Sequence, residues 1–256
     1  MSQQTIKLHW AHSKPNFGDC LSPLICELIS QRKVVHAKIN KCDLIAAGSL
    51  LQRKKESLWT RKMNVWGTGF IEQSDKHKSK HTYHALRGRF SASLLSNQSI
   101  SVFGDPGLLA DQLINPAQIS KRYEIGIVPH YKDRYLPIIT QLKSDHKGVK
   151  IIDVFQDPKE VITQIAQCHA ILSSSLHGLI SADSLNIPNI RIEISSNIRG
   201  GDWKFNDYYS IFGIESLKIS GDRLNKATEL NSYLEQYNRP RLDEIKDELY
   251  KSFPSI

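Results

Sequence analysis

The residues best suited to chemistry lie in one stretch, residues 170–188, where an apolar run passes through three serines into Leu176-His177-Gly178. This pattern is typical of a buried strand that turns into a helix. The free amide groups and the dipole at such a helix start favour an anion such as phosphate or carboxylate. His177 could hold or protonate that anion. A purely structural interpretation also fits, namely a serine-capped junction in which His177 is hydrogen-bonded within a packed wall.

Anion-binding and proton-carrying residues recur at the ends of other predicted strands. They are Asp19, Arg87, Asp105, His130 and Lys204. Arg87 offers a planar fork suited to carboxylate or phosphate, although a surface salt bridge would also explain it. Asp19 fits either a helix cap or a side chain in a cleft. His130 fits either a donor to an anion or an ordinary hydrogen-bonded loop histidine.

Several common catalytic motifs are absent from the sequence. Without G-x-G-x-x-G after the first strand or G-x-x-x-x-G-K-[ST], nicotinamide and P-loop chemistry are disfavoured. Without G-x-S-x-G or H-E-x-x-H, an α/β-hydrolase or a zincin is disfavoured. The three serines stand too close in sequence to His177 to form a nucleophile–base pair with it.

Composition narrows the class of protein. With 256 residues, 40% hydrophobic and 23% charged, the chain is expected to fold around a substantial core. The net charge of +8 favours acidic partners, while zinc-finger spacing and RNP-type motifs are absent, which argues against nucleic acid. The four cysteines form no C-x-x-C pair and are expected to be reduced thiols. The start lacks a signal-peptide core and no apolar run reaches spanning length, so we expect a cytoplasmic protein.

Alternating strands and helices predict an α/β protein with two Rossmann-like lobes, parallel sheets and an active-site cleft between the lobes. The boundary falls between residues 111 and 123, giving lobes at 1–117 and 118–256. In the first lobe we expect strands at 6–10, 43–48, 64–69, 81–87 and 101–107 and helices at 21–30 and 90–95. In the second we expect strands at 123–129, 149–153, the start of 170–188, and 188–194, with helices at 136–142, 158–167, 177–186, 225–237 and 242–252. A loop is expected at 199–209, and the last helix is suited to docking across a lobe.

Seven short motifs, taken in their order, resemble the polysaccharide pyruvyl transferase family. They are Asn16–Asp19, Gly67–Gly69, Leu86–Gly88, Gly104–Pro106, Ile127–His130, Ser173–Ile180 and Gly201–Tyr209. The resemblance implies a fold like that of the GT-B glycosyltransferases, phosphoenolpyruvate as donor and a sugar diol as acceptor. It also implies that His177 acts at the phosphoenolpyruvate site and that Arg87 helps to bind the donor. Many family members carry arginine where this chain has Ser175, so one expected donor-binding cation is missing.

This resemblance and the residue types together predict a ketal-forming enzyme. It would move a pyruvyl group from phosphoenolpyruvate onto two hydroxyls of a sugar in a cell-surface polysaccharide precursor. The expected catalytic residues are His177 as acid and Asp19 as base or acceptor clamp. The expected binding residues are Asn16, Arg87, Asp105, His130, Ser173, Ser174, Ser175, Gly178 and Lys204. We expect no cofactor and no metal ion, with the acceptor on the first lobe and the donor on the second.

The basic charge is compatible with a lipid-linked acceptor and with peripheral contact at the inner face of the membrane. Residues 53–55 and 76–81 are basic and are expected to be solvated loops, or alternatively a docking face for anionic lipid. Two other functions stay open. One is a GT-B glycosyltransferase that uses a nucleotide sugar, and the other is a non-catalytic anion-binding protein.

Overall fold

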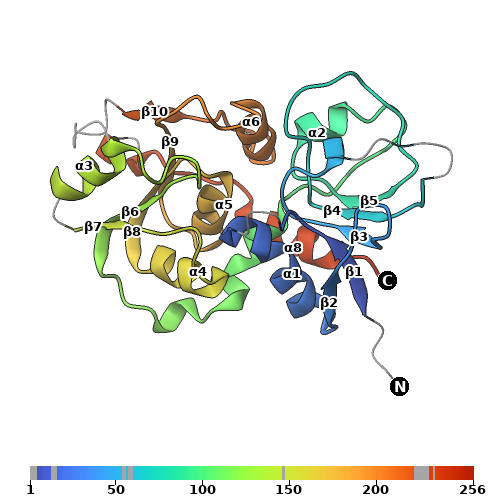
Figure 1. Ribbon diagram of the computed structural model, residues 1–256, viewed down its shortest axis with the longest axis horizontal. Helices are drawn as coiled ribbons and strands as arrows, with labels where there is room; N and C mark the ends of the chain where they lie inside the picture. The colour runs from blue at the N-terminus through green and yellow to red at the C-terminus, as the bar shows by residue number, and fades with distance from the viewer. Residues whose placement is uncertain are drawn as a thin grey trace.

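Two parallel β-sheets organise the chain, and Figure 1 shows them in two lobes that lie side by side. This computed structural model describes residues 5–12, 16–53, 56, 60–145, 148–221, 231–232 and 234–256. Lobe 1 is formed by the elements up to residue 113 and lobe 2 by those from 123 to 221. The expected α/β architecture of two Rossmann-like lobes with parallel sheets is confirmed.

Lobe 1 is built on a five-stranded sheet in the order β2-β1-β3-β4-β5, with every neighbouring pair parallel. The strands are β1 (Ile6–His9), β2 (Val34–His36), β3 (Leu44–Ile45), β4 (Asn64–Trp66) and β5 (Thr82–Ala85). Ile6 and Leu8 are buried while Lys7 is exposed, which is the alternation that predicts the first strand. The helices are α1 (Phe17–Ser30) and α2 (Arg89–Ser93), with 3-10 turns η1 (Leu51–Arg53) and η2 (Pro106–Leu113); a further turn, η3 (Pro116–Gln118), lies between the two lobes in sequence.

Lobe 2 repeats this plan in a second parallel sheet, in the order β10-β9-β8-β6-β7. Its strands are β6 (Tyr123–Val128), β7 (Val149–Ile151), β8 (Cys168–Ser173), β9 (Asn189–Glu193) and β10 (Lys218–Ser220). Its helices are α3 (Pro137–Asp145), α4 (Pro158–Ala166), α5 (Leu176–Ser184) and α6 (Trp203–Tyr209). Strands of this kind need helices on their faces because a parallel sheet exposes apolar residues on both sides.

The strand order fixes where a ligand can bind. In each sheet the second strand is added on one side of the first strand and the later strands on the other side. A crevice therefore opens where the strand order reverses, between β1 and β3 in lobe 1 and between β6 and β8 in lobe 2. Ligands of open α/β sheets bind at this point, outside the carboxyl ends of the strands. The loops that follow β1, β3, β6 and β8 are therefore the places to look for a site.

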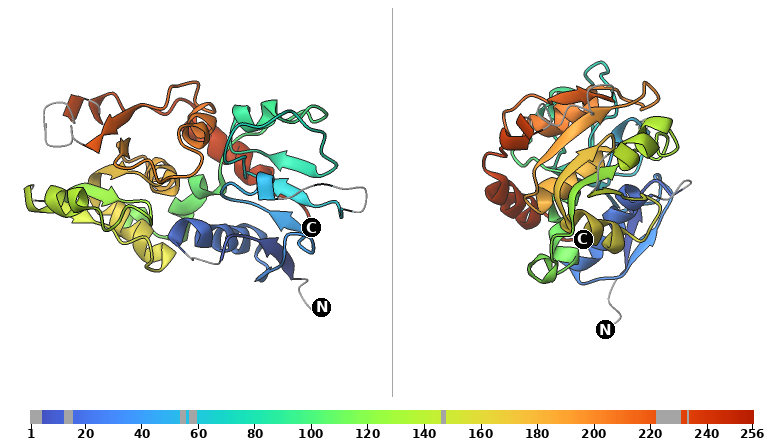
Figure 2. Two further views of the ribbon diagram at one scale, coloured as in Figure 1. Left: turned by 45° about the horizontal axis from the view of Figure 1, so that its top comes forward. Right: turned by 90° about the vertical axis from the view of Figure 1, so that its left-hand side faces the viewer.

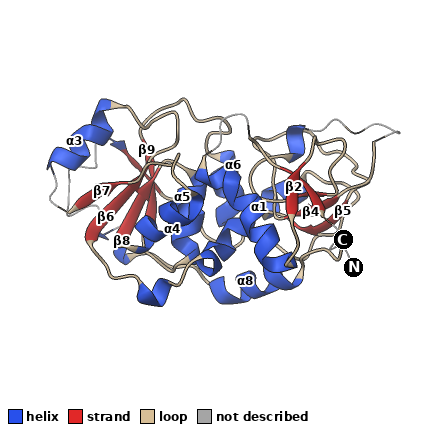
Figure 3. Cartoon of the chain, turned by 60° about the horizontal axis from the view of Figure 1, so that its bottom comes forward, coloured by secondary structure: helices blue, strands red, loops and turns tan. Residues whose placement is uncertain are grey.

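The two lobes share one hydrophobic core and are joined by a layer of helices, which Figure 3 shows between the sheets. Helices α1 of lobe 1 and α5 of lobe 2 both pack against η2. Leu8, Leu21, Leu109, Leu179 and Phe205 belong to the same buried cluster, although they come from both lobes. The lobes therefore meet through packed side chains and not only through a linker.

The last helix, α8 (Leu242–Lys251), crosses back to lobe 1, and the C-terminus lies beside that lobe (Figure 2). The Trp66 indole Nε1 donates to the carbonyl oxygen of Leu249 over 3.0 Å, and its ring meets Phe253 edge-on. Lys246 pairs with Asp111 at 2.7 Å. The sequence division places this helix in the second lobe, and its contacts reach both lobes, because Lys246 also donates to the carbonyl oxygen of Ser184 on α5 at 3.0 Å. It therefore acts as a strap between the lobes.

Several local expectations were wrong. Residues 101–107 form one bridge, Leu86 to Phe103, because Gly104 takes a φ of 149° and Asp105 caps η2. The segment 199–209 was expected to be a loop but contains helix α6. The three-residue strands β2 and β10 carry too few residues for a periodic signal. Most of the helix expected at 225–237 lies outside the described residues.

No helix in the described part of the chain is long and apolar enough to cross a membrane.

The strap can be tested by mutation. Leu249 is fully buried against lobe 1, so Leu249→Ala is expected to lower the free energy of unfolding by about 2–5 kcal/mol through the lost burial and the cavity left behind. Tyr250→Ala, on the exposed side of the same helix, is expected to change it by less than about 0.5 kcal/mol. Urea unfolding of both variants measures this. Equal losses in the two variants would contradict the packing of α8 on lobe 1.

Candidate functional site

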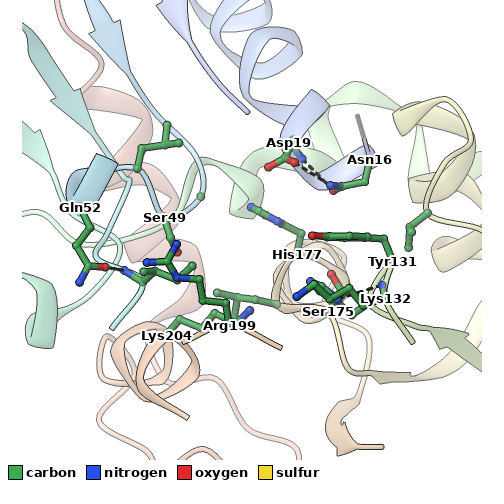
Figure 4. A pocket seen from close by; sticks show the side chains of 16 residues that line it. Asn16, Asp19, Ser49, Gln52, Tyr131, Lys132, Ser175, His177, Arg199 and Lys204 are labelled. Carbon is green, nitrogen blue, oxygen red and sulfur yellow. Dashed lines mark hydrogen bonds between the residues drawn. The ribbon is translucent and has the colours of Figure 1, made fainter. Parts of the chain in front are cut away.

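A cavity of about 460 Å³ lies between the lobes, at the carboxyl ends of both sheets (Figure 4). Every lining residue follows a strand: β1, β3 or β4 in lobe 1, and β6, β7, β8 or β9 in lobe 2. The lining residues are Asn16, Asp19, Gly48, Ser49, Leu50, Gln52, Ile71, His130, Tyr131, Lys132, Val154, Ser175, Leu176, His177, Arg199 and Lys204. The two crevices predicted by the strand order thus form one site.

The lobe 1 wall presents a carboxylate at the start of α1. Asn16 is the N-cap residue, and its side-chain oxygen accepts from the backbone amide of Asp19 at 3.3 Å. The Asn16 amide Nδ2 donates to the Asp19 carboxylate at 2.8 Å (Figure 4). Asn16 and not Asp19 therefore caps the helix, and this bond aims the Asp19 carboxylate. Asp19 is the one acidic residue among the described residues that line the cavity.

His177 reaches from the first turn of α5 across the cavity towards lobe 1 (Figure 4). Its ring occupies the space beside Gly18, where a Cβ atom would collide with it, and lies near Gly48. The ring nitrogen Nε2 is buried and has no hydrogen-bond partner among the described residues. The structural interpretation of His177 required a hydrogen-bonded ring, whereas this nitrogen is unpaired.

Cationic side chains from lobe 2 line the opposite wall. Lys204 on α6 is only 8% exposed, and its ammonium makes no hydrogen bond or ion pair with the described residues. Lys132 donates to the carbonyl oxygen of Asn197 at 2.9 Å, and Arg199 pairs across the lobes with Glu72 at 3.0 Å. A buried ammonium without a counter-ion is costly, so this wall is suited to an anionic ligand.

The electrostatics of the cavity agree with this. Burial, together with the charges of Arg87, Arg191 and Lys132, lowers the pKa of Lys204 to about 7, against a smaller opposing effect of Asp133. Burial and the nearby Lys204 charge likewise lower the pKa of His130 to about 4. His130 is therefore neutral near pH 7, while Lys204 is poised to gain or lose its proton.

A buried carboxylate, Asp133, holds the loops of this wall together. It accepts from the Ser174 hydroxyl at 2.9 Å and from the Ser195 hydroxyl at 2.6 Å. Ser174 in turn accepts from the backbone amide of His130 at 2.9 Å. One carboxylate thus links the loops after β6, β8 and β9, which carry His130, His177 and the cations.

The profile of the polysaccharide pyruvyl transferase family matches residues 5–196. The chain belongs to this family. The match includes every lining residue of the cavity except Arg199 and Lys204. The sequence-based resemblance is confirmed.

Two relatives and two solved structures are similar to this chain. The uncharacterized protein L143 of Acanthamoeba polyphaga mimivirus is 30% identical over 222 residues, which cover 83% of this chain and 76% of that protein. The succinoglycan biosynthesis protein ExoV of Rhizobium meliloti (strain 1021) is 25% identical over 210 residues, which cover 80% of this chain and 64% of ExoV. The crystal structure of a functionally uncharacterized Klebsiella pneumoniae protein is 11% identical, covers 84% of this chain and 92% of that protein, and has a TM-score of 0.47. A structure of the wall teichoic acid polymerase TagF is 12% identical, covers 96% of this chain and 84% of that protein, and has a TM-score of 0.49. Both scores are too low to indicate function.

Arg87, expected to bind the donor, is fully buried behind the cavity wall and is not among the lining residues. Its Nη2 pairs with the buried carboxylate of Asp207 on α6 at 2.8 Å, and its Nη1 donates to the Ser49 hydroxyl at 2.6 Å. Arg87 therefore supports two lining residues of the family site, Ser49 and, through α6, Lys204.

Other expected binding residues also stand behind the wall. Asp105 accepts from the amides of Gly107 at 2.9 Å and Gly48 at 3.3 Å. Ser173 donates to the Val128 carbonyl oxygen at 2.7 Å, and Gly178 leaves the space that its hydroxyl occupies. By contrast, six expected residues do line the cavity: Asn16, Asp19, His130, Ser175, His177 and Lys204.

The sequence interpretation did not select Tyr131, Lys132, Ser49, Gln52 or Arg199. Lys132 and Tyr131 follow His130 directly, and Ser49 follows Gly48 shortly after β3, so their positions after strands were the available signal. Arg199 lies further along the loop that follows β9, and Gly200 packs that loop against Ile71 of lobe 1. Of the basic segments, residues 54–55 lie outside the described residues, and Ser79 and His81 of the second segment are buried.

The supporting role of Arg87 predicts a loss of stability. Arg87→Met leaves the Asp207 carboxylate buried without its cation and is expected to lower the free energy of unfolding by about 3–5 kcal/mol. Arg89→Met, which removes an exposed arginine two residues later, is expected to have little effect. Urea unfolding tests this, with Arg87→Lys as a variant that keeps the charge. Wild-type stability combined with weakened anion binding in Arg87→Met would instead favour direct donor contact.

The lowered pKa of Lys204 predicts pH-dependent anion binding. The protonated ammonium, which attracts an anion, is lost as the pH rises through about 7. The dissociation constant for sulfate, which does not titrate in this range, is therefore expected to rise by up to about tenfold per pH unit above about pH 7. Calorimetric titration from about pH 6 to about pH 9 measures it. Lys204→Arg is expected to remove most of this dependence, and Lys204→Met to bind weakly throughout; an unchanged pH profile in both would exclude Lys204 as the titrating group.

Proposed function

We propose that this protein transfers the pyruvyl group of phosphoenolpyruvate to two hydroxyls of a sugar in a polysaccharide precursor, forming a cyclic ketal. Family membership supports pyruvyl transfer in polysaccharide biosynthesis. The observation that carries the donor is that the buried side chain of Lys204, which has no ion-pair partner among the described residues, lines the same cavity as His177, whose Nε2 is unpaired. Together they offer an anion site and a proton carrier in one enclosed space.

Phosphoenolpyruvate carries a phosphate and a carboxylate, and the lobe 2 wall is suited to both. Lys204, Lys132 and Arg199 supply positive charge, while the amides at the start of α5 favour an anion. Because the lining carboxylate, Asp19, lies on the opposite wall, the charge is separated across the cavity. This separation supports a donor bound on lobe 2 and acceptor hydroxyls directed towards Asp19 on lobe 1.

The reaction needs a proton at the methylene carbon of the donor. His177 Nε2 would deliver it, which turns the enol carbon into an electrophile that one sugar hydroxyl attacks. The carbon–oxygen bond to phosphate then breaks with the cations stabilising the leaving charge, and the second hydroxyl adds to the same carbon. The two sugar hydroxyls release two protons. One restores the proton that His177 gave to the methyl group, and the other leaves with the phosphate. Asp19 would accept protons from the hydroxyls.

The finer identity of the acceptor rests on the same proposal. ExoV is, by its name, a succinoglycan biosynthesis protein, which supports a saccharide acceptor for this chain. A lipid-linked acceptor, a position at the inner face of the membrane, and independence of metal and cofactor stay predictions. So does the assignment of the donor to phosphoenolpyruvate in place of a nucleotide sugar.

The proposal predicts that the protein releases phosphate from phosphoenolpyruvate only when an acceptor saccharide is present. Mass spectrometry of the saccharide is expected to show the mass gain of a pyruvate ketal. His177→Gln is expected to lower turnover by about 10²–10⁴-fold because the proton donor is lost. His169→Gln, at an exposed histidine on β8, is the matched control and is expected to keep wild-type turnover.

The rival functions give different results in the same experiment. A glycosyltransferase would leave phosphoenolpyruvate intact and would extend the saccharide when given a nucleoside diphosphate sugar. A non-catalytic protein would bind phosphoenolpyruvate without consuming it. Established ketal formation that survives unchanged in His177→Gln would remove His177 from the catalytic role.

A further inference from the structure

A row of aromatic side chains leads out of the cavity on the lobe 2 side. Tyr131 lines the cavity, and its ring lies 6.4 Å from that of Phe155. The guanidinium of Arg134 lies over the rings of both Phe155 and Tyr135, 4.2 Å and 4.4 Å from their centroids. Exposure increases along the row, reaching 39% for Phe155 and 82% for Tyr135. We call Tyr131, Arg134, Tyr135 and Phe155 the aromatic rim.

The aromatic rim lies next to the start of α1, which carries the carboxylate expected to face the acceptor. Val154, which precedes Phe155, accepts from the backbone amide of Phe17 at 2.8 Å. Phe17 is flanked in sequence by Asn16 and is two residues from Asp19. Figure 4 shows Tyr131 extending beneath Asn16 towards His177. The rim is therefore continuous with the side of the cavity that holds Asp19, away from Lys204 on α6.

Neither core packing nor stability explains this surface. Tyr135 is almost fully exposed, and its hydroxyl has no hydrogen-bond partner among the described residues. Its ring and that of Phe155 each contact the Arg134 guanidinium, and these cation–π contacts join the two rings in one row. Exposed aromatic residues gathered beside a cavity are typical of binding surfaces.

The composition of the rim favours a saccharide. A pyranose ring has an apolar C–H face that can lie on an aromatic ring, and hydroxyl groups at its edge that accept from a guanidinium such as that of Arg134. A surface that enters a membrane would be expected to add aliphatic side chains. The two large hydrophobic residues exposed on these loops, within the described chain, are both aromatic.

We propose that the aromatic rim binds sugar units of the acceptor next to the unit that reacts, so that this enzyme recognises an oligosaccharide in preference to a single sugar. This inference rests on the proposed function, in which a sugar is the acceptor. The reacting unit lies at Asp19, and its neighbours continue over Tyr131 and Phe155 to Tyr135.

The experiment measures binding of neutral gluco- and galacto-oligosaccharides, each tested from the monosaccharide to the hexasaccharide, to the full-length protein by calorimetry. For at least one series, affinity is expected to rise with length. Tyr135→Ala and Phe155→Ala are each expected to lower the affinity for the longest saccharide by about fivefold or more, while monosaccharide binding stays unchanged. Tyr250→Ala removes a comparably exposed aromatic ring from α8 and is expected to bind as wild type. Sulfate binding at the Lys204 wall is expected to be the same in all four proteins.

The results separate this inference from the proposed function. Length-dependent binding that disappears in Tyr135→Ala supports the rim even if phosphoenolpyruvate is not consumed, in which case only the reaction assignment fails. If affinity does not depend on length, or if the rim variants bind like Tyr250→Ala, the proposal is overturned. It is also overturned if the rim variants lose binding to phosphatidylglycerol vesicles while keeping wild-type saccharide affinity, because the surface would then serve a membrane.

Discussion

The buried ion pair between Arg87 and Asp207 determines how the two lobes meet at the cavity. Arg87 follows the last strand of the first sheet, whereas Asp207 lies on α6, between strands β9 and β10 of the second sheet. Two desolvated charges are stable only when their remaining donors and acceptors are satisfied. Arg87 also donates to Ser49, and Ser91 donates to Asp207 at 2.7 Å through both its amide and its hydroxyl. Because Lys204 lies one turn before Asp207, this pair also sets the position of the cavity's buried ammonium.

Charge in the cavity is separated by the fold and does not depend on one residue. The cations come from loops after β6 and β9 of one sheet, while the carboxylate comes from the first turn after β1 of the other. The carboxylate of Asp133 offsets part of the positive charge, but it lies behind the cavity wall and accepts hydrogen bonds from the hydroxyls of Ser174 and Ser195. Burial lowers the pKa of Lys204 most, and the neighbouring cations lower it further; a bound dianion would offset the repulsion from those cations. Anion affinity is therefore a property of how the two sheets face each other.

Sequence patterns predicted the elements that depend on residues close together in the chain. They did not predict features that depend on contacts between distant segments. The corner from β8 into α5 was predicted because apolar periodicity changes within one stretch, and His177 was correctly placed in a cleft. Helix α6 was missed because its seven residues are held by tertiary contacts, such as the bond of the Tyr208 hydroxyl to Asp183 at 2.7 Å. Arg87 was expected at the donor because a strand end does not reveal which helix from the other lobe covers it.

The same geometry explains how the cavity can be cationic with Ser175, and not the arginine expected from the sequence resemblance, at the start of α5. Ser175 lies at the start of α5, between the loop of Lys132 and the helix that carries Lys204, and all three line the cavity. An additional guanidinium there would add repulsion to an ammonium whose pKa is already near 7. Lys132 and Arg199 instead approach from loops tied to backbone and to Glu72, where their charge is partly exposed to water. The positive charge of the cavity is thus distributed over Lys132, Arg199 and Lys204, with an uncharged serine at the start of α5.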